Sequence, residues 1–276
     1  MNFAITTVCP AGHEHIGAFA EVSDSFHHAL LQLGHQSTQA VNVLFSDARN
    51  IILGANTLGP EEPLPENSIL VNLEQLESNT LLPPHYFDRL LHHTVWDYSA
   101  ANVRLLRSRG ARNVTRVRLG YVPELTRISG KEPDIDVLFY GSLNPRRLAV
   151  LDQLSAAGAR VERLFGLYGA ERDAYISRSK IVLNMHFYEA KVLEVVRIFY
   201  LLANGVFVVS ERGADTEESG RFEGGLAFSG YEQLGSTCLR YLGDPRSRQL
   251  IAARGQGLIR QQEQTQYLAP AIAALR

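Results

Sequence analysis

The sequence predicts an α/β protein built on parallel sheets. In both halves of the chain, short apolar runs with the composition of buried strands alternate with longer segments of helical composition. Short connections between these runs are typical of βαβ units, whose crossovers are right-handed. The 276 residues are long for one domain and suffice for two compact domains of about 130 residues each.

The clearest βαβ unit lies in the second half of the chain. Residues 181–183 form a β-branched apolar run that predicts a buried strand. Residues 191–204 are long enough for about four helical turns and are followed by Gly205, an ordinary helix C-terminal signal. Residues 206–209 predict the next strand, so the unit is expected to be parallel.

The remaining elements are expected in the following order. Strands are predicted at 3–8, 37–42, 50–53, 68–73, 94–99, 135–140, 161–165 and 226–228, with 113–119 closing the first half. Helices are predicted at 19–33, 86–92, 99–110, 147–157, 175–179, 231–242, 245–262 and 266–275. The turn-rich segment 127–134 is the clearest break in composition. We therefore expect one domain at residues 1–128 and a second at 129–276.

Composition narrows the functional classes. An apolar fraction of 45% with 20% charged residues is that of a soluble globular protein, and a net charge of −2 provides no bulk attraction to nucleic acid or acidic membranes. The two cysteines, Cys9 and Cys238, lie in opposite halves without metal-type partners. No stretch approaches a membrane span, and the N-terminus lacks the features of a signal peptide. We expect a cytoplasmic protein without a transmembrane segment.

Polar residues at the ends of the second-half strands are the first candidates for a site. Asn184, His186 and Glu189 follow the strand at 181–183, and ligands of parallel sheets bind at the carboxyl ends of the strands. In the apolar segment that follows, Glu194 and Arg197 lie three residues apart. They could form an ion pair at the end of a helix. Alternatively, Glu194 accepts hydrogen bonds from ribose hydroxyls while Arg197 faces phosphate, with Lys191 one turn earlier.

A second candidate lies after the strand predicted at 135–140. Gly141 and Ser142 allow close backbone approach, and Arg146 and Arg147 follow at the start of a helix. Backbone N–H groups and arginines at such a turn can cradle a diphosphate. The same pattern also occurs in ordinary surface turns.

The loop after the first strand holds His13, Glu14 and His15. A histidine near neutral pH can act as a general base, although a solvated polar loop would have the same composition. The glycines of this loop do not form the Gly-x-Gly-x-x-Gly pattern of nicotinamide and flavin enzymes. None of the histidine pairs has metal-ligand spacing with an acidic residue, so we expect no metal site.

The segment from Asn184 through Glu194 to Gly205, with 208–211, resembles the donor-binding segment of GT-B glycosyltransferases, especially the bacterial and phage family 1-like group. Residues 136–147 are similar to the strand and glycine loop that open the donor domain, and 120–123 more weakly to the interdomain crossing. The resemblance implies two Rossmann-like domains with parallel sheets facing across a cleft. It also implies a nucleotide-sugar bound mainly by the C-terminal domain, no metal, and a last helix that packs back on the first domain.

The resemblance gives the candidate residues roles. Tyr168 would stack on the nucleotide base, although it could equally be a packed tyrosine. Arg146, Arg147 and Arg197 would neutralise the charge of the diphosphate. One of His13, Glu14 and His15 would take the proton of the acceptor. The expected donor-binding residues are Gly141, Ser142, Arg146, Arg147, Tyr168, Asn184, His186, Glu189, Lys191, Glu194 and Arg197.

The chain departs from the family pattern at two positions. Many retaining members carry a second glutamate eight residues before the one matched by Glu194, and this chain has His186 there. Members also often have glutamate five residues before the helix-ending glycine, where this chain has Tyr200. The chain can therefore be matched to the family in two ways. One match makes Glu194 the residue that binds the ribose, and we prefer it. The other leaves no acidic residue for this role. Inversion and retention of stereochemistry both stay open.

The sequence thus predicts a metal-independent glycosyltransferase that moves a sugar from a nucleotide-diphosphate-sugar donor, with no cofactor besides that substrate. Two alternatives remain: a nucleotide-sugar epimerase of the same fold, and a noncatalytic module that binds a nucleotide-sugar or a protein. The acceptor could be a glycan, a lipid, a protein, a small molecule or a modified DNA base.

Overall fold

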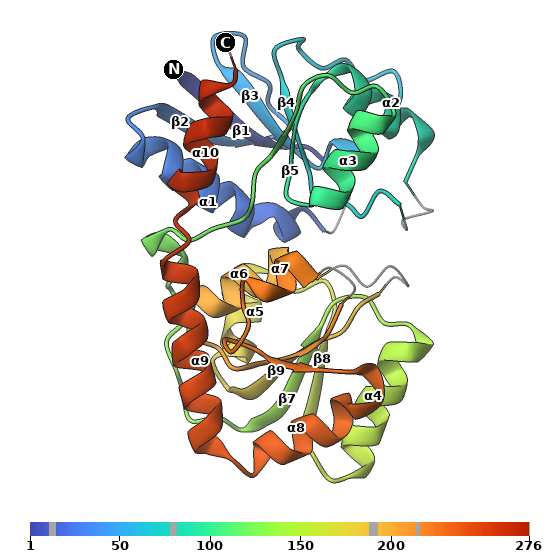
Figure 1. Cartoon of the computed structure of the whole chain (residues 1–276), viewed down its shortest axis with the longest axis vertical. Helices are drawn as coiled ribbons and strands as arrows, with labels where there is room; N and C mark the ends of the chain where they lie inside the picture. Colours follow the sequence, from blue (N-terminus) through green and yellow to red (C-terminus); the bar gives the residue numbers. More distant parts are fainter. Residues whose placement is uncertain (11–14, 78–81, 188–192, 214–215, 276) are drawn as a thin grey trace. The chain divides into compact units, whose positions relative to one another are not determined.

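The computed structural model describes residues 1–10, 15–77, 82–187, 193–213 and 216–275 (Figure 1). By their internal contacts the residues divide into two compact units. The first comprises Met1–Glu124 together with the segment from Gln262 onward, and the second comprises Leu125–Gln261. Each unit contains one sheet, and all strand pairs within the described sheets are parallel. The expected α/β class with two parallel sheets is confirmed.

The first unit has a six-stranded sheet of order β2-β1-β3-β4-β5-β6. Its strands are β1 (Asn2–Thr7), β2 (Gln36–Val41), β3 (Arg49–Leu53), β4 (Ile69–Asn72), β5 (Thr94–Asp97) and β6 (Val114–Arg116). Its helices are α1 (Ala20–Gln32), α2 (Pro84–His92), α3 (Ala100–Ser108) and α10 (Gln264–Ala273), with short 3-10 turns η1 (Ile16–Phe19) and η2 (Ala55–Thr57). A third 3-10 turn, η3 (Pro123–Leu125), spans the point in the chain where the first unit ends and the second begins.

The contacts of successive side chains in β5 show which helices cover each face of this sheet. Val95 belongs to a core cluster that includes Tyr86 of α2 and Leu106 of α3. Trp96, the next residue, is fully buried and lies edge-on to the ring of Phe26 in α1. Because successive strand residues point to opposite faces, α2 and α3 cover one face and α1 the other.

The second unit has a five-stranded sheet of order β11-β10-β9-β7-β8. Its strands are β7 (Ile135–Tyr140), β8 (Val161–Leu164), β9 (Ser179–Asn184), β10 (Val208–Glu211) and β11 (Ala227–Ser229). Its helices are α4 (Pro145–Ala156), α5 (Gly169–Ile176), α6 (Val195–Ala203), α7 (Thr216–Gly220), α8 (Leu234–Leu242) and α9 (Pro245–Arg260), with the 3-10 turn η4 (Tyr231–Gln233). Side chains of β7, β9 and β10 pack with α4 and α8 in one apolar cluster.

Helix boundaries differ from expectation in three places. The helix expected from residue 191 begins at Val195 in the described chain, so Glu194 is its N-cap residue and lies outside its turns. The helix expected at 175–179 is α5, which begins at Gly169 and ends at Ile176, and Ser179 instead opens β9. The short helix α7 lies in a segment where no helix was expected. Polar composition alone does not separate a solvated helix from a loop.

No helix in the described part of the chain has both the length and the apolar composition needed to cross a membrane.

Candidate functional site

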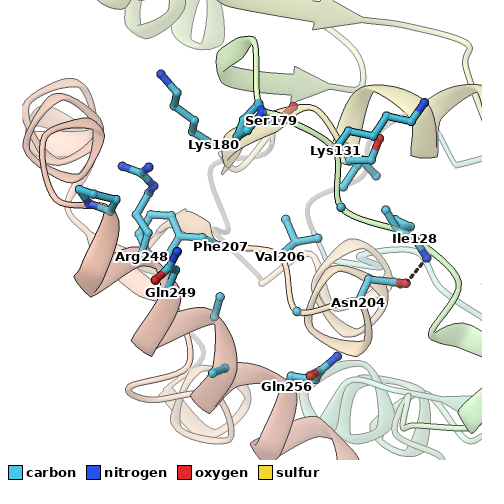
Figure 2. A pocket seen from close by; sticks show the side chains of 18 residues that line it. Ile128, Lys131, Ser179, Lys180, Asn204, Val206, Phe207, Arg248, Gln249 and Gln256 are labelled. Carbon is cyan, nitrogen blue, oxygen red and sulfur yellow. Dashed lines mark hydrogen bonds between the residues drawn. The ribbon is translucent and has the colours of Figure 1, made fainter.

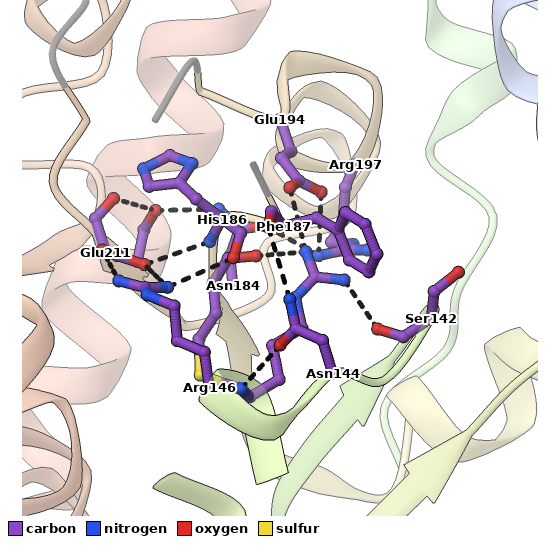
Figure 3. Close-up of polar contacts among 12 residues, drawn as sticks. Ser142, Asn144, Arg146, Asn184, His186, Phe187, Glu194, Arg197 and Glu211 are labelled. Carbon is purple, nitrogen blue, oxygen red and sulfur yellow. Dashed lines mark hydrogen bonds and ion pairs between the residues drawn. The ribbon is translucent and has the colours of Figure 1, made fainter. Parts of the chain in front are cut away.

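The candidate site lies at the carboxyl ends of β7, β9 and β10 in the second unit (Figure 3). These three strands are neighbours in the parallel sheet, so the residues that follow them share one edge. Two helices, α4 and α6, begin at this edge and direct the positive ends of their dipoles toward it. The strand order therefore assembles residues that are far apart in the chain.

The turn after β7 is shaped by Gly141 and Asn144. Gly141 has φ +124°, and a Cβ at this position would lie 2.9 Å from Nη2 of Arg197. The Asn144 side chain caps α4, since its Oδ1 accepts from the backbone N–H of Arg147 at 2.9 Å. Its Nδ2 donates to the carbonyl of Phe187 at 3.3 Å, which joins this turn to the loop after β9.

The guanidinium of Arg147 is buried and forms hydrogen bonds to several protein groups. Its guanidinium donates to the carbonyls of Ser142, at 2.8 Å, and Met185, and to Oε1 of Glu194 at 3.0 Å. The residue is only 2% exposed, and burial lowers the pKa of Arg147 to about 10 although the Glu194 charge opposes this shift. Arg147 therefore ties the loops after β7 and β9 to the start of α6.

Glu194 and Arg197 form the i,i+3 ion pair that was one of the two alternatives for them, with 3.4 Å between Nη1 and Oε2. The pair is not isolated, because Glu194 also binds Arg147, and Arg197 donates from Nη1 to Oδ1 of Asn184 at 2.8 Å. The Asn184 amide is oriented by a 3.0 Å hydrogen bond to Oγ of Ser210. The side chains of Glu194 and Arg197 are 20% and 13% exposed, so their charges lie mostly inside the protein.

Arg146 forms a second ion pair that the sequence reasoning missed. Its guanidinium binds both carboxylate oxygens of Glu211, one at 2.7 Å, and donates to the carbonyl of His186 at 3.2 Å. The backbone N–H of His186 donates to Oε2 of Glu211 at 3.1 Å. Burial favours the neutral form of Glu211, but hydrogen bonds from Arg146 outweigh it and hold the pKa of this carboxyl below its usual value.

Glu211 could have been found from the sequence. It is a charged residue that follows the apolar run 206–209 after Ser210, at the expected carboxyl end of a buried strand. The guanidinium of Arg146, its partner, also lies 3.9 Å from the centre of the Tyr231 ring.

The charges of this cluster do not balance. Three guanidinium groups, of Arg146, Arg147 and Arg197, surround two carboxylates, of Glu194 and Glu211, in the described part of the site. A mostly buried excess of positive charge is costly unless a counter-ion accompanies it. The geometry thus suits an anionic group placed at the starts of α4 and α6.

The structure assembles Gly141, Ser142, Arg146, Arg147, Asn184, His186, Glu194 and Arg197 at one edge of the second sheet. Tyr168 follows the neighbouring strand β8 and precedes α5, and burial raises the pKa of its hydroxyl. Its contact with a nucleotide base stays a prediction.

The other predicted residues are placed as follows. His15 lies in the first unit, directly before η1 and after the end of β1. His13, Glu14, Glu189 and Lys191 lie outside the described residues. Within the described ranges, no three His, Cys, Asp or Glu side chains are grouped as metal ligands.

The sequence of the chain matches a family model and a viral protein. A family model described as glycosyl transferase-like matches residues 124–273, more than half of the chain. An uncharacterized protein of Acanthamoeba polyphaga mimivirus is 32% identical over 127 residues, which are 44% of this chain and 40% of that protein. The chain therefore spans well under two thirds of that relative's length.

Three solved structures resemble the whole chain. AviGT4, a glycosyltransferase involved in avilamycin A biosynthesis, has a TM-score of 0.61 at 13% identity over 100% of this chain and 97% of its own. HepE of Anabaena, in complex with UDP and glucose, has a TM-score of 0.60 at 14% identity over 98% and 99%. Sucrose-phosphate synthase of Thermosynechococcus elongatus has a TM-score of 0.57 at 13% identity over 100% and 98%. The chain has the GT-B fold and belongs to the glycosyl transferase-like family.

Proposed function

We propose that this protein transfers a sugar from a nucleotide-diphosphate-sugar donor to an acceptor, and that the second unit binds the donor. One observation carries the proposal: three arginines gather around only two carboxylates at the carboxyl edge of the second sheet. A diphosphate would supply the missing negative charge. Membership of a glycosyltransferase family makes a sugar nucleotide the natural source of that diphosphate.

The chemistry of transfer fits this arrangement. Negative charge grows on the nucleoside diphosphate as it leaves the sugar, and fixed cations in a partly buried site stabilise that charge without reorganising. Arg197 is proposed to contact the diphosphate, with backbone groups of Gly141 and Ser142 alongside. Arg147 would act by holding Glu194, whose carboxylate would accept hydrogen bonds from the ribose hydroxyls.

The remaining roles complete the proposal. Asn184 orients Arg197, and His186 would lie near the sugar or phosphate. The other proposed donor-binding residues are Arg146, Tyr168, Glu189 and Lys191. One of His13, Glu14 and His15 would take the proton of the acceptor, and neither a metal nor a cofactor is needed for these steps.

UDP-glucose is the appropriate first donor to test. HepE, one of the similar structures, has been solved with UDP and with UDP-glucose. Calorimetric titration with UDP should show binding. The protein should also release UDP from UDP-glucose, at least by slow transfer of the glucose to water. A noncatalytic binding module would bind UDP without this release.

Substitution of Glu194 tests the site itself. Glu194→Gln keeps the shape of the side chain and removes its charge, so UDP affinity should fall about tenfold or more, as expected for hydrogen bonds to a charged group. Glu171→Gln, an exposed change on α5, is the control and should bind UDP like the wild type. If Glu194→Gln instead lowers the melting temperature and leaves UDP affinity unchanged, the residue is only part of an ion pair.

A further inference from the structure

The loop after β4 in the first unit is held by side chains that bind the main chain of one residue, Glu74. The carbonyl of Glu74 accepts from the side-chain amides of Asn72, at 3.1 Å, and Asn102, at 2.7 Å. Its N–H donates to Oδ1 of Asn72 at 3.2 Å. Both backbone polar groups of Glu74 are therefore positioned by side chains of β4 and α3.

The two amides are themselves fixed by a buried carboxyl group. Asp97, at the end of β5, accepts from Asn72 at 2.6 Å and from Asn102 at 3.3 Å. The backbone N–H of Ser99 also donates to Asp97, at 2.7 Å. Tyr86 of α2 donates to Oδ1 of Asn72 at 2.9 Å, so the network joins α2, α3, β4 and β5.

Such a network adds little to stability compared with apolar packing. Asn72 and Asp97 are fully buried, and burying amides and a carboxyl group is at best compensated by the hydrogen bonds they form. The hydrogen bonds instead fix one conformation of the backbone at Glu74, because moving this residue would leave several buried polar atoms without partners. The network is thus suited to preorganising the loop that carries the Glu74 side chain.

The Glu74 carboxylate lies where parallel sheets bind their ligands. Its Oε1 accepts from Nδ2 of Asn56, in the turn after β3, at 3.2 Å, and the residue is partly exposed. The carboxylate therefore sits at the carboxyl edge of the first sheet, beside the ends of β3 and β4. Main chain and side chain are both held, while part of the residue remains accessible to a ligand.

We propose that Glu74 binds a hydroxyl group of the acceptor, and that the acceptor is a polyhydroxylated compound. The inference rests on the proposed glycosyl transfer. A carboxylate is only an acceptor of hydrogen bonds, so its ligand must supply donors, and neighbouring hydroxyls of a sugar or polyol supply them in pairs. Hydrogen bonds to an ionised group are about twice as strong as neutral ones, which makes one such residue enough to bias acceptor choice.

The test compares donor binding with acceptor-stimulated turnover in the full-length protein. UDP release from UDP-glucose is measured alone and with a fixed panel of glycerol, mannitol, methyl α-glucoside and methyl β-glucoside. Calorimetric titration with UDP is run in parallel. The variants are Glu74→Gln, which removes the charge, Glu74→Asp, which keeps it on a shorter stem, and Glu77→Gln, an exposed glutamate of the same loop that serves as control.

We expect Glu74→Gln to keep the wild-type melting temperature and UDP affinity while its acceptor-stimulated rate falls about tenfold or more. Glu74→Asp should lose less, and Glu77→Gln should behave like the wild type. The inference is overturned if no compound of the panel stimulates the wild type, or if Glu74→Gln is stimulated as strongly as the wild type. Failure of the wild type to bind UDP would instead contradict the proposed function.

Discussion

Arg197 differs from the two neighbouring arginines in how completely protein groups neutralise it. Arg146 binds both oxygens of Glu211, and Arg147 has Glu194 at 3.0 Å together with two carbonyls. Among the residues that the structure describes, the nearest carboxylate oxygen to Arg197 is 3.4 Å away, and the shortest hydrogen bond of Arg197 is to a neutral amide. Arg197 therefore retains the most positive charge for a bound anion.

Replacing Arg197 with methionine should weaken UDP binding about tenfold or more, because a charge-assisted hydrogen bond to phosphate is lost while the apolar stem is kept. Calorimetric titration with UDP measures the change. Arg160→Met, which removes an arginine whose side chain is 59% exposed, is the matched control. Equal UDP affinities of the two variants would contradict the role proposed for Arg197.

Asp97 should make the stability of the first unit depend on pH. Burial raises the pKa of its carboxyl from 3.8 to about 7, although hydrogen bonds from Asn72 and Ser99 oppose the shift. The folded chain then binds more protons than the unfolded chain between about pH 4 and pH 7. The free energy of unfolding should fall as the pH rises through this window, by roughly 4 kcal/mol at most.

Asp97→Asn should remove this dependence, since an amide does not titrate. The variant should be less stable at low pH, where its side chain cannot accept from Asn72 in the same way, but its melting temperature should change less between pH 4 and pH 7. Thermal unfolding of both proteins across this range measures the difference. Parallel pH profiles of the two proteins would show that Asp97 is not the group responsible.

At the scale of elements, the turn between β7 and α4 depends on glycine for two separable reasons. Gly141 and Gly158 both have positive φ, which disfavours any residue with a Cβ. The two positions differ in the space for a Cβ. A Cβ added at Gly141 would lie 2.9 Å from Nη2 of Arg197, whereas one added at Gly158 would meet open space. Since a guanidinium at the end of a long side chain can move, we expect Arg197 to shift.

Gly141→Ala and Gly158→Ala should therefore destabilise the protein similarly, each by about 1 kcal/mol, but only Gly141→Ala should weaken UDP binding. Denaturant unfolding and calorimetric titration with UDP separate the two effects. If the two variants bind UDP equally well, the glycine matters for backbone conformation alone.

The helix α6 shows which part of an element is predictable from local sequence. The apolar pattern and the terminal Asn204–Gly205 predicted a helix here and its end, and α6 ends at Ala203. Its start was predicted too early, because Leu193 is apolar and buried without being helical. The N-cap is instead Glu194, whose carboxylate is held by Arg147, a residue 47 positions earlier in the chain.

At the scale of the whole molecule, Gln264 connects segments that are distant in sequence. Its Oε1 accepts from the N–H of Gly120 at 2.7 Å and from Oγ of Ser25 at 3.2 Å, and its Nε2 donates to the carbonyl of Arg118 at 3.0 Å. The residue is fully buried, and it belongs to α10, which lies beside α1 in the first unit (Figure 1).

Gln264→Ala should lower the free energy of unfolding by about 2 kcal/mol or more, because buried partners lose their hydrogen bonds. Gln266→Ala, an exposed change two residues later on the same helix, should have little effect. Thermal unfolding measures both. Similar melting temperatures of the two variants would mean that α10 is held by apolar packing alone.

The second unit also has a pocket of about 560 Å³ away from the candidate site (Figure 2). Its lining combines apolar side chains such as Phe207 with Lys131, Lys180 and Arg248. Lys180 is paired with Asp136, and Arg248 donates to carbonyls at the end of α8. The charges of Lys180 and Arg248 are therefore already used in contacts within the protein. This distinguishes the pocket from the carboxyl edge of the second sheet, where Arg197 lies.

Local patterns in the chain were enough to predict the α/β class, the approximate position of each described strand and most of the residues now found together in the second unit. This is because buried strands, helix ends and strand-terminal polar residues are properties of neighbouring positions. Glu211 as partner of Arg146, 65 residues away, and the side chains that hold Glu74 were not predicted. Those pairings depend on which strands lie side by side, and strand order is set by the packing of the whole sheet.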